Sequence, residues 1–280
     1  MSRAIIGTLL YVLLTASVPA QDDAQHLARE IMDRSGLDSQ IEQIPLHIQA
    51  GLEQSQAQEQ PLPPQEFERL SRIMAGAYDP KAIKATVLEH LERLSAEDLQ
   101  AVLDWLNTPL GRKIVALEEA TSAPEARDAL PGVWQRFLTG EIPAERVDRI
   151  QRLIKAVNAI DLTVDLLENM QLAMASALSA YSQPGATLPL DELKKQIEGN
   201  RLVIRNMVAQ EILVSSLHTY EALDNAGLDQ YLDFAVSPPG KSYHDAVFAA
   251  FSDALAQAAR RMADTLGREL QKERVEGGAV

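Results

Sequence analysis

The stretch LDWLNTPLGR at residues 103–112 returns in the second half of the chain as LDFAVSPPGK at residues 232–241. The same offset aligns residues 83–112 with residues 212–241 without a gap, and nine of the thirty aligned positions are identical. Three more pairs keep their chemistry: Trp105 and Phe234, Thr108 and Ser237, Arg112 and Lys241. A repeat of this length indicates a duplicated structural unit, so it describes the architecture before any activity.

Helical signals continue on both sides of the repeat. Apolar residues recur every three or four positions, no stretch alternates as a β-strand would, and helix-forming Ala, Leu, Gln and Glu are abundant. We therefore predict an all-α helical bundle built from two duplicated halves, residues 21–142 and 143–275, with a loose tail at residues 276–280. The boundary falls at Glu141-Ile142-Pro143, and a long helix is expected from about Glu145 to Tyr181.

Glycine and proline mark the expected breaks in the first half. Gly36 should end the first helix, and Pro45 should kink or restart the second. Residues 54–65 contain three prolines among polar residues and are predicted to be a linker.

The repeated phrase has the form of a corner between two helices. Thr108 and Ser237 suit the N-cap position, and the prolines that follow them suit the first helical turn. A glycine inside a helix costs roughly 1 kcal/mol, so Gly111 and Gly240 indicate the close approach of another helix. We expect Asp104 to turn toward Arg112, and Asp233 toward Lys241, near the start of the second helix of each corner.

This corner supplies all the candidate site residues, which are Asp104, Thr108, Pro109, Gly111, Arg112, Asp233, Ser237, Pro238, Gly240 and Lys241. A structural corner is the favoured interpretation because capping residues and glycines commonly occur at the ends of helices. The alternative is an anion site, in which free backbone N–H groups and Arg112 or Lys241 hold a carboxylate or phosphate.

The two phrases resemble the hallmark of the bacterial domain of unknown function 2059 family. The residues that carry the resemblance are Leu103-Asp104-Trp105 with Thr108-Pro109-Leu110-Gly111-Arg112, and Leu232-Asp233-Phe234 with Ser237-Pro238-Pro239-Gly240-Lys241. The resemblance implies two copies in tandem in an exported, helical protein. Because members of that family are biochemically uncharacterised, it implies no particular chemistry.

The first twenty residues have the pattern of an export signal. Arg3 precedes an apolar run, and Val18-Pro19-Ala20 places small residues at a cleavage site that would leave Gln21 as the new N-terminus. The alternative is a membrane anchor, but the run is shorter than the ~20 residues that a span needs. We expect a periplasmic or secreted protein without a transmembrane segment in its mature chain, and the absence of cysteine excludes disulfides and thiol catalysis.

Charge and motif content exclude several classes of function. The net charge of −14 disfavours binding to nucleic acid, which requires clustered Lys and Arg. The five histidines lack metal-ligand spacing and are interpreted as surface residues. Glu118-Glu119 is assigned to a solvated helix face, although it could be a carboxylate pair. Met170, Met174, Leu172 and Leu178 have core spacing but could line an apolar groove.

No catalytic, cofactor-binding or metal-binding residue is predicted, and no cofactor is expected. The favoured hypothesis is a non-enzymatic binding or scaffolding module of a bacterial cell envelope, whose partner is an envelope protein or a small apolar ligand. One alternative is a small-molecule or lipid-binding periplasmic protein with a pocket between helices. Another is a hydrolase whose carboxylates converge only in three dimensions.

Overall fold

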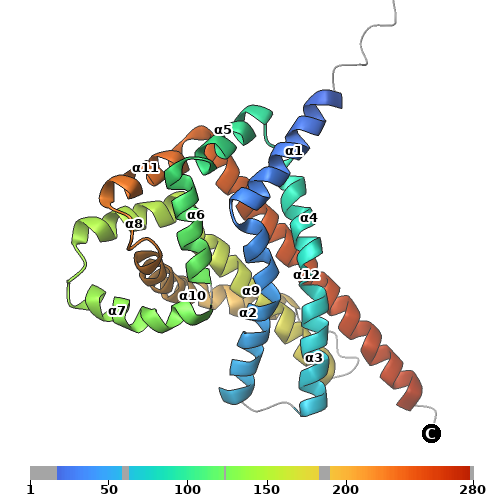
Figure 1. The fold of residues 1–280 in the computed structure, drawn as a ribbon. Helices are drawn as coiled ribbons and strands as arrows, with labels where there is room; N and C mark the ends of the chain where they lie inside the picture. Colours follow the sequence, from blue (N-terminus) through green and yellow to red (C-terminus); the bar gives the residue numbers. More distant parts are fainter. Residues whose placement is uncertain (1–17, 59–62, 123, 183–189, 278–280) are drawn as a thin grey trace, which may run out of the picture.

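The protein is helical throughout the part of the chain that the structure describes, which confirms the all-α prediction. In this computed structural model the described residues are 18–58, 63–122, 124–182 and 190–277. Figure 1 shows the arrangement. The elements are α1 (Val18–Arg34), α2 (Leu37–Gln58), α3 (Pro64–Ala77), α4 (Pro80–Leu91), α5 (Ala96–Leu106), α6 (Pro109–Ser122), the 3-10 helix η1 (Pro124–Ala129), α7 (Leu130–Leu138), α8 (Ala144–Ala156), α9 (Ala159–Ser182), α10 (Leu190–Thr219), α11 (Asn225–Val236) and α12 (Pro238–Gly277).

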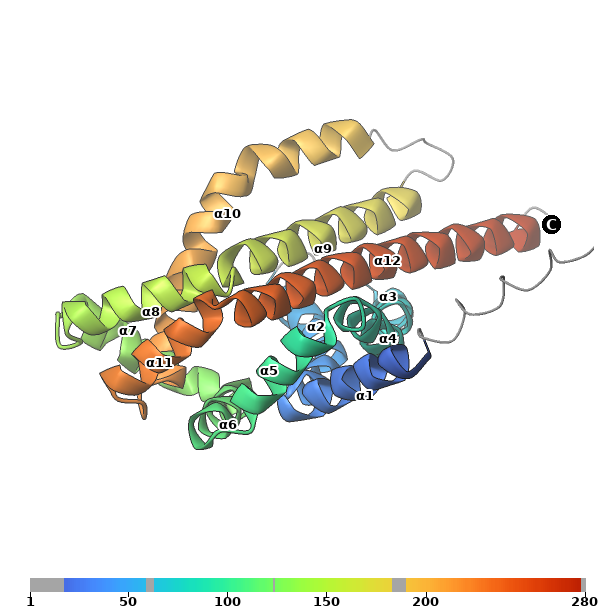
Figure 2. The same cartoon turned by 90° about the horizontal axis from the view of Figure 1, so that it is seen from above.

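The last helix, α12, lies at the centre of the bundle. It packs against α9 on one side and against α3, α4 and α5 on the other, as Figure 2 shows from above. α1 packs on α5 and α4, and α2 packs on α3 and α4. α12 therefore lies between α9 of its own half and the helices α3, α4 and α5 of the first half. None of the described helices is long and apolar enough to cross a bilayer.

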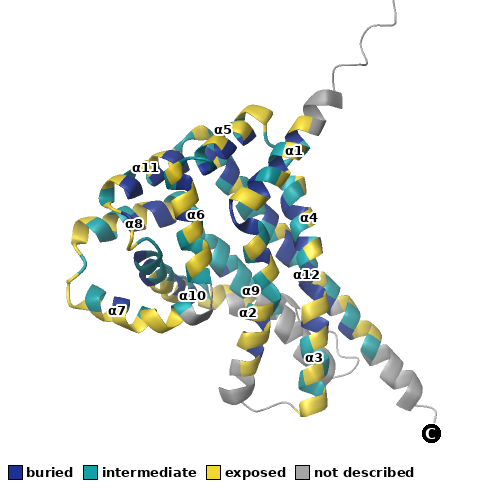
Figure 3. Cartoon of the chain, in the orientation of Figure 1, coloured by how far each residue is buried: buried dark blue, intermediate teal, exposed yellow. Residues whose placement is uncertain are grey.

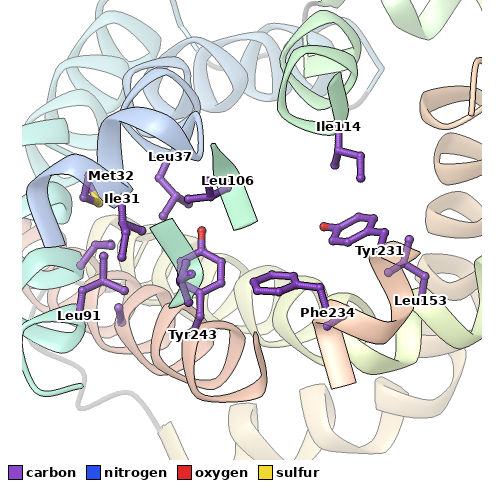
Figure 4. Close-up of a cluster of buried hydrophobic side chains, with 14 of the residues drawn as sticks. Ile31, Met32, Leu37, Leu91, Leu106, Ile114, Leu153, Tyr231, Phe234 and Tyr243 are labelled. Atoms are coloured by element: carbon purple, nitrogen blue, oxygen red, sulfur yellow. The ribbon is translucent and has the colours of Figure 1, made fainter. Parts of the chain in front are cut away.

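One hydrophobic core is shared by the two halves. Its largest buried cluster joins Ile31 of α1 and Leu99 of α5 with Leu228 of α11 and Ala250 of α12. In Figure 4, Tyr243, Phe234 and Tyr231 from the second half extend between Leu37 and Ile114 from the first. Figure 3 shows buried residues gathered where α1, α4, α5 and α12 meet, while most of α7 is exposed or half-buried. The predicted boundary falls in the loop between α7 and α8, but the core crosses it.

Helix ends in the repeated segments use matching positions. Ser95 Oγ accepts a hydrogen bond from the Asp98 N–H at 3.0 Å, which caps α5. Asp224, at the equivalent position of the second segment, caps α11 by accepting from the Gly227 N–H at 2.8 Å. The helix order α4–α5–α6 corresponds to α10–α11–α12. The two segments also differ, because α10 continues through the position equivalent to the α3–α4 break and α12 is much longer than α6.

Several predicted boundaries need correction. Gly36 ends α1 with a positive φ of 73°, as expected, but α2 runs continuously through Pro45. α2 reaches Gln58 and α3 begins at Pro64, so the linker between them is shorter than predicted. At the other end, α12 extends to Gly277, into the segment predicted to be a tail. Residues 1–17, which include most of the predicted signal peptide, lie outside the described part of the chain.

The predicted long helix from Glu145 to Tyr181 is wrong, because it is divided at Val157-Asn158. Asn158 adopts a φ of 55°, so α8 ends at Ala156 and α9 begins at Ala159. Asparagine tolerates this left-handed conformation better than other residues that carry a Cβ, and it commonly follows a helix C-terminus. Periodicity alone could not show the break, because the apolar pattern continues across it.

We predict that Asn158→Ala lowers the free energy of unfolding by about 1 kcal/mol, because alanine is strained at this φ. Asn158→Gly should leave it within about 0.5 kcal/mol of the parent. Asn206→Ala, at an exposed site inside α10, serves as the control. Urea unfolding of the three variants measures the effect, and equal stability of Asn158→Ala and the parent would contradict it.

Candidate functional site

The two repeated corners have the same hydrogen bonds. Thr108 Oγ1 donates to the Trp105 carbonyl at 2.7 Å and accepts from the Gly111 N–H at 2.9 Å. Ser237 Oγ donates to the Phe234 carbonyl at 2.6 Å and accepts from the Gly240 N–H at 3.2 Å. Each hydroxyl therefore closes one helix and opens the next, as the N-cap assignment predicts. α6 and α12 begin at Pro109 and Pro238.

The glycines are needed because the preceding helix ends against them. A Cβ on Gly111 would lie 2.3 Å from the Trp105 carbonyl oxygen, and one on Gly240 would lie 1.9 Å from the Phe234 carbonyl oxygen. These are backbone atoms at the end of α5 and α11. The predicted close approach is therefore made by the helix directly before each glycine in the chain, and both glycines are buried.

The predicted ion pairs of the corner are not formed. Asp104 is exposed and its Oδ1 accepts from Gln100 Nε2 at 2.8 Å, while the Arg112 guanidinium donates to the Asn107 carbonyl. Asp233 and Lys241 are both exposed, and no ion pair joins them in the described structure. The physical reason is that helix side chains tilt toward the N-terminus. An aspartate in the last turn of a helix therefore points back along that helix, away from the corner.

The two corners meet through their aromatic residues. The Trp105 ring stacks on Phe234 with centroids 4.0 Å apart and planes 9° apart. It also stacks on Tyr231 at 5.3 Å. Trp105 and Phe234 occupy the same position of the repeated phrase, so equivalent residues of the two segments form the contact. Such aromatic pairs contribute about 0.5–1.5 kcal/mol beyond their buried area.

A carboxylate with two tyrosine donors lies beside this stack. Glu118 Oε1, on α6, accepts from the Tyr220 hydroxyl at 2.7 Å and from the Tyr231 hydroxyl at 3.2 Å. The carboxylate group is surrounded by protein, although the residue keeps some exposure to solvent. The interpretation of Glu118 as part of a solvated face is therefore wrong. Its neighbour Glu119 is exposed, so the two do not form a facing pair.

Burial governs the electrostatics of this cluster, which consists of Glu118, Tyr220 and Tyr231. Desolvation raises the pKa of Glu118, and the two phenol hydroxyls oppose that rise. Burial and then the charge of Glu118 raise the pKa values of Tyr220 and Tyr231 well above their ordinary range. Both phenols therefore stay protonated and donate to the carboxylate. The cluster ties α6 to the end of α10 and to α11.

Polar contacts around the cluster link α6 and α8 to the end of α10 and to the residues that follow it. Thr121 Oγ1 lies 3.0 Å from Thr219 Oγ1, and Lys113 Nζ donates to the Ala222 carbonyl at 2.9 Å. Arg146 of α8 donates to the Tyr220 carbonyl at 2.5 Å. Among the described residues, the hydrogen bonds to the Glu118 carboxylate come from the two phenol hydroxyls. The chemistry of the cluster is that of a fixed polar junction.

The other sequence candidates are dispersed. His90 Nε2 lies 2.8 Å from Asp253 Oδ2, and the histidine side chain is only 12% exposed. His244 differs from the prediction of surface histidines, because burial lowers its pKa to about 4. No group of three potential metal ligands occurs among the residues that the structure describes. The side chains of Met170, Met174 and Leu178 lie outside the described residues.

Part of this region also matches a known protein family. Residues 90–130, which contain the first corner and Glu118, match the family described as "Uncharacterized protein conserved in bacteria (DUF2059)". This match supports the resemblance seen in the sequence. It covers one copy of the repeated phrase. No curated protein and no solved structure is significantly similar to the chain.

We predict that Gly111→Ala lowers the free energy of unfolding by about 1–3 kcal/mol, because the new Cβ displaces the end of α5. Gly111→Leu should cost at least as much, and Asp104→Ala less. Gly132→Ala on α7 is the matched control, since its Cβ meets nothing within 4 Å, and it should stabilise by up to about 1 kcal/mol. Thermal melts compare the four variants. A Gly111→Leu variant that melts like the parent but loses a ligand would show that the corner is a binding site.

We predict a pH dependence from Glu118. Because its folded pKa is raised above 4.5, its protonated form is favoured on folding, and the resulting stability is present below pH 4.5 and lost as pH rises through the folded pKa. The parent should therefore lose stability relative to Glu118→Gln as pH rises from 4 to 7. Unfolding curves across this range measure the difference. Glu119→Gln should change stability by less than about 0.5 kcal/mol, and a pH-independent difference for Glu118→Gln would refute the assignment.

Proposed function

We propose that this protein is an exported, non-enzymatic binding module of a bacterial cell envelope, built from two tandem copies of the unit matched at residues 90–130. The tandem arrangement is supported by the shared corner hydrogen bonds and by the matched caps Ser95 and Asp224. A non-enzymatic role is supported by the cluster around Glu118, whose phenols are held as donors.

Export is the first element of the proposal. Cleavage after Ala20 would take only the first three residues of α1, and the buried side chains described in α1 begin at Ala24. The mature chain would therefore keep the core contacts of this helix. We expect N-terminal sequencing of the envelope-localised protein to begin at Gln21. An intact Met1 in membrane-bound material would favour the anchor instead.

The observation that carries the binding role is an apolar face on α10 that none of the described helices covers. Leu202, Val203 and Met207 are 69%, 59% and 58% exposed. Val203 and Met207 are four residues apart and share one face of α10, and Leu202 precedes Val203 in the chain. Exposed apolar patches of this kind mark interaction sites more often than isolated apolar residues do. We call these three residues the α10 patch.

Ion pairs between α10 and α9 fix the orientation of α10, so that the α10 patch does not face α9. Arg201 pairs with Asp165 at 2.8 Å and with Glu168, and Arg205 pairs with Asp161. These acids are on α9, while Ile204 and Val208 of α10 pack on the same helix with Val164. α9 therefore binds one side of α10 and leaves the patch on another. Figure 2 shows α10 on the far side of α9 from α12.

The occupant that fits is an amphipathic helix of a partner protein with basic residues beside its apolar face. Glu198 and Glu211 are exposed on either side of the α10 patch along the helix. The net charge of −14 disfavours an anionic lipid surface and a second copy of this acidic chain. An amphipathic helix contacts an apolar surface through anchors spaced by three or four residues.

The test is site-specific photo-crosslinking from Val203 in the envelope, followed by mapping of the crosslinked peptide. We expect one partner segment with helical apolar spacing and basic flanks. Met207→Glu should reduce the crosslink at least about tenfold, since it places a charge in the contact. Leu138→Glu is the control, because Leu138 is 61% exposed on α7. A crosslink to a second copy of the chain or to lipid would overturn the proposed partner.

A further inference from the structure

An open cleft lies between α3 and α12, well away from the corners and from the α10 patch. Its volume is about 340 Å³, within the range of small-molecule sites. α3 runs beside the second part of α12 in Figure 1. The cleft is lined by residues of both helices: Arg69, Arg72, Ile73, Gly76, Ala77, Arg261, Asp264, Thr265, Arg268 and Glu269.

The two walls of the cleft are joined at both ends. Arg261 donates to the Ala77 carbonyl through Nε at 3.0 Å and through Nη2 at 2.8 Å. At the other end, Arg69 Nε donates to Glu269 Oε2 at 2.8 Å. The helices are therefore antiparallel along the cleft. In this register, Arg72 of α3 and Arg268 of α12 lie at similar heights along the cleft, on opposite sides of it.

These two arginines have no acidic partner among the described residues. Arg72 makes no hydrogen bond or ion pair with that part of the chain, and Arg268 donates only to Thr265 Oγ1 at 3.2 Å. The lining has four arginines and two carboxylates, an excess of two positive charges. The chain as a whole has a net charge of −14. A local positive excess in an acidic protein attracts anions to this cleft rather than to the surface at large.

The lining also leaves space for a ligand. Gly76 is exposed on α3, and a Cβ placed on it would meet nothing within 4 Å. Ile73 and Ala77 are buried at the base of the cleft. A glycine inside a helix costs about 1 kcal/mol relative to alanine, and here no close approach of backbone accounts for it. A larger side chain at this position would enter the cleft.

We propose that the cleft between α3 and α12 binds a phosphate group, with Arg72 and Arg268 as its direct ligands. Arginine presents a planar fork that matches phosphate oxygens with two parallel hydrogen bonds. A phosphate monoester has a charge of about −1.5 to −2 at neutral pH, which matches the charge excess of the lining. Arg69 and Arg261 connect α3 to α12 and add positive potential to the cleft. The negative charge of Asp264 disfavours the binding of more highly charged anions. The phosphate belongs either to a small soluble ester or to a lipid headgroup.

The experiment uses the full chain in two arms. Isothermal titration calorimetry with inorganic phosphate tests the soluble source, in buffer of low ionic strength. Cosedimentation with vesicles that contain phosphatidic acid, whose headgroup is a phosphate monoester, against vesicles of phosphatidylcholine alone, tests the headgroup. We expect saturable binding in at least one arm. Arg72→Ala combined with Arg268→Ala should weaken it at least about tenfold, because each lost charge-assisted hydrogen bond has an effect of that order. Arg72→Lys should weaken it less.

Matched controls separate the cleft from general charge and folding. Arg29 and Arg260 are exposed and lie outside the lining, so the combined Arg29→Ala and Arg260→Ala variant removes the same charge elsewhere. Gly76→Leu should abolish binding without loss of helicity, whereas Gly267→Leu on α12, also with open space, should bind normally. Binding only in the vesicle arm would assign the phosphate to lipid. No binding in either arm, or equal binding by the cleft and control variants, would overturn the proposal.

Discussion

At each of the two corners, the last turn of one helix packs so closely against the first turn of the next helix that a glycine is required there. The carbonyl oxygens of Trp105 and Phe234 lie where a Cβ of Gly111 or Gly240 would have to lie. The hydroxyl of Thr108 or Ser237 can then reach both helices at once. Each corner is tight enough to direct its aromatic residue inward, and Trp105 meets Phe234 as a result. The contact between the repeated segments therefore depends on the absence of a side chain at Gly111 and at Gly240.

Local patterns in the sequence predicted the features that depend on few neighbours. The corner caps and the end of the first helix at Gly36 follow from residue type and spacing. The direction of Asp104 was also decided locally, but by the tilt of helix side chains, which sequence separation alone does not convey. The break at Asn158 was missed because a single residue, rather than the apolar period, ends α8.

Local sequence patterns could not predict the features that depend on tertiary packing. The carboxylate of Glu118 is enclosed only because Tyr231 of α11 and Tyr220 after α10 cover it. One signal could have indicated this. In the register of the repeat, Glu118 corresponds to Val247, and Tyr220, Tyr231 and Tyr243 correspond to Leu91, Val102 and Ile114. Polar groups at positions whose counterparts are apolar indicate a polar site inside a core. The cleft between α3 and α12 had no such signal, since its arginines are close only after folding.

The position of α12 has a consequence for the order in which the protein can fold. Ala250 and Ala254 belong to the same buried cluster as Ile31, Ile83 and Val87, which lie in the first third of the chain. The N-terminal helices therefore cannot complete their core until α12 has been synthesised. Contacts of such sequence separation form late, because a long loop must close before they contribute. A nascent chain that still lacks α12 leaves these apolar faces uncovered, and its core is complete only once α12 has packed against them.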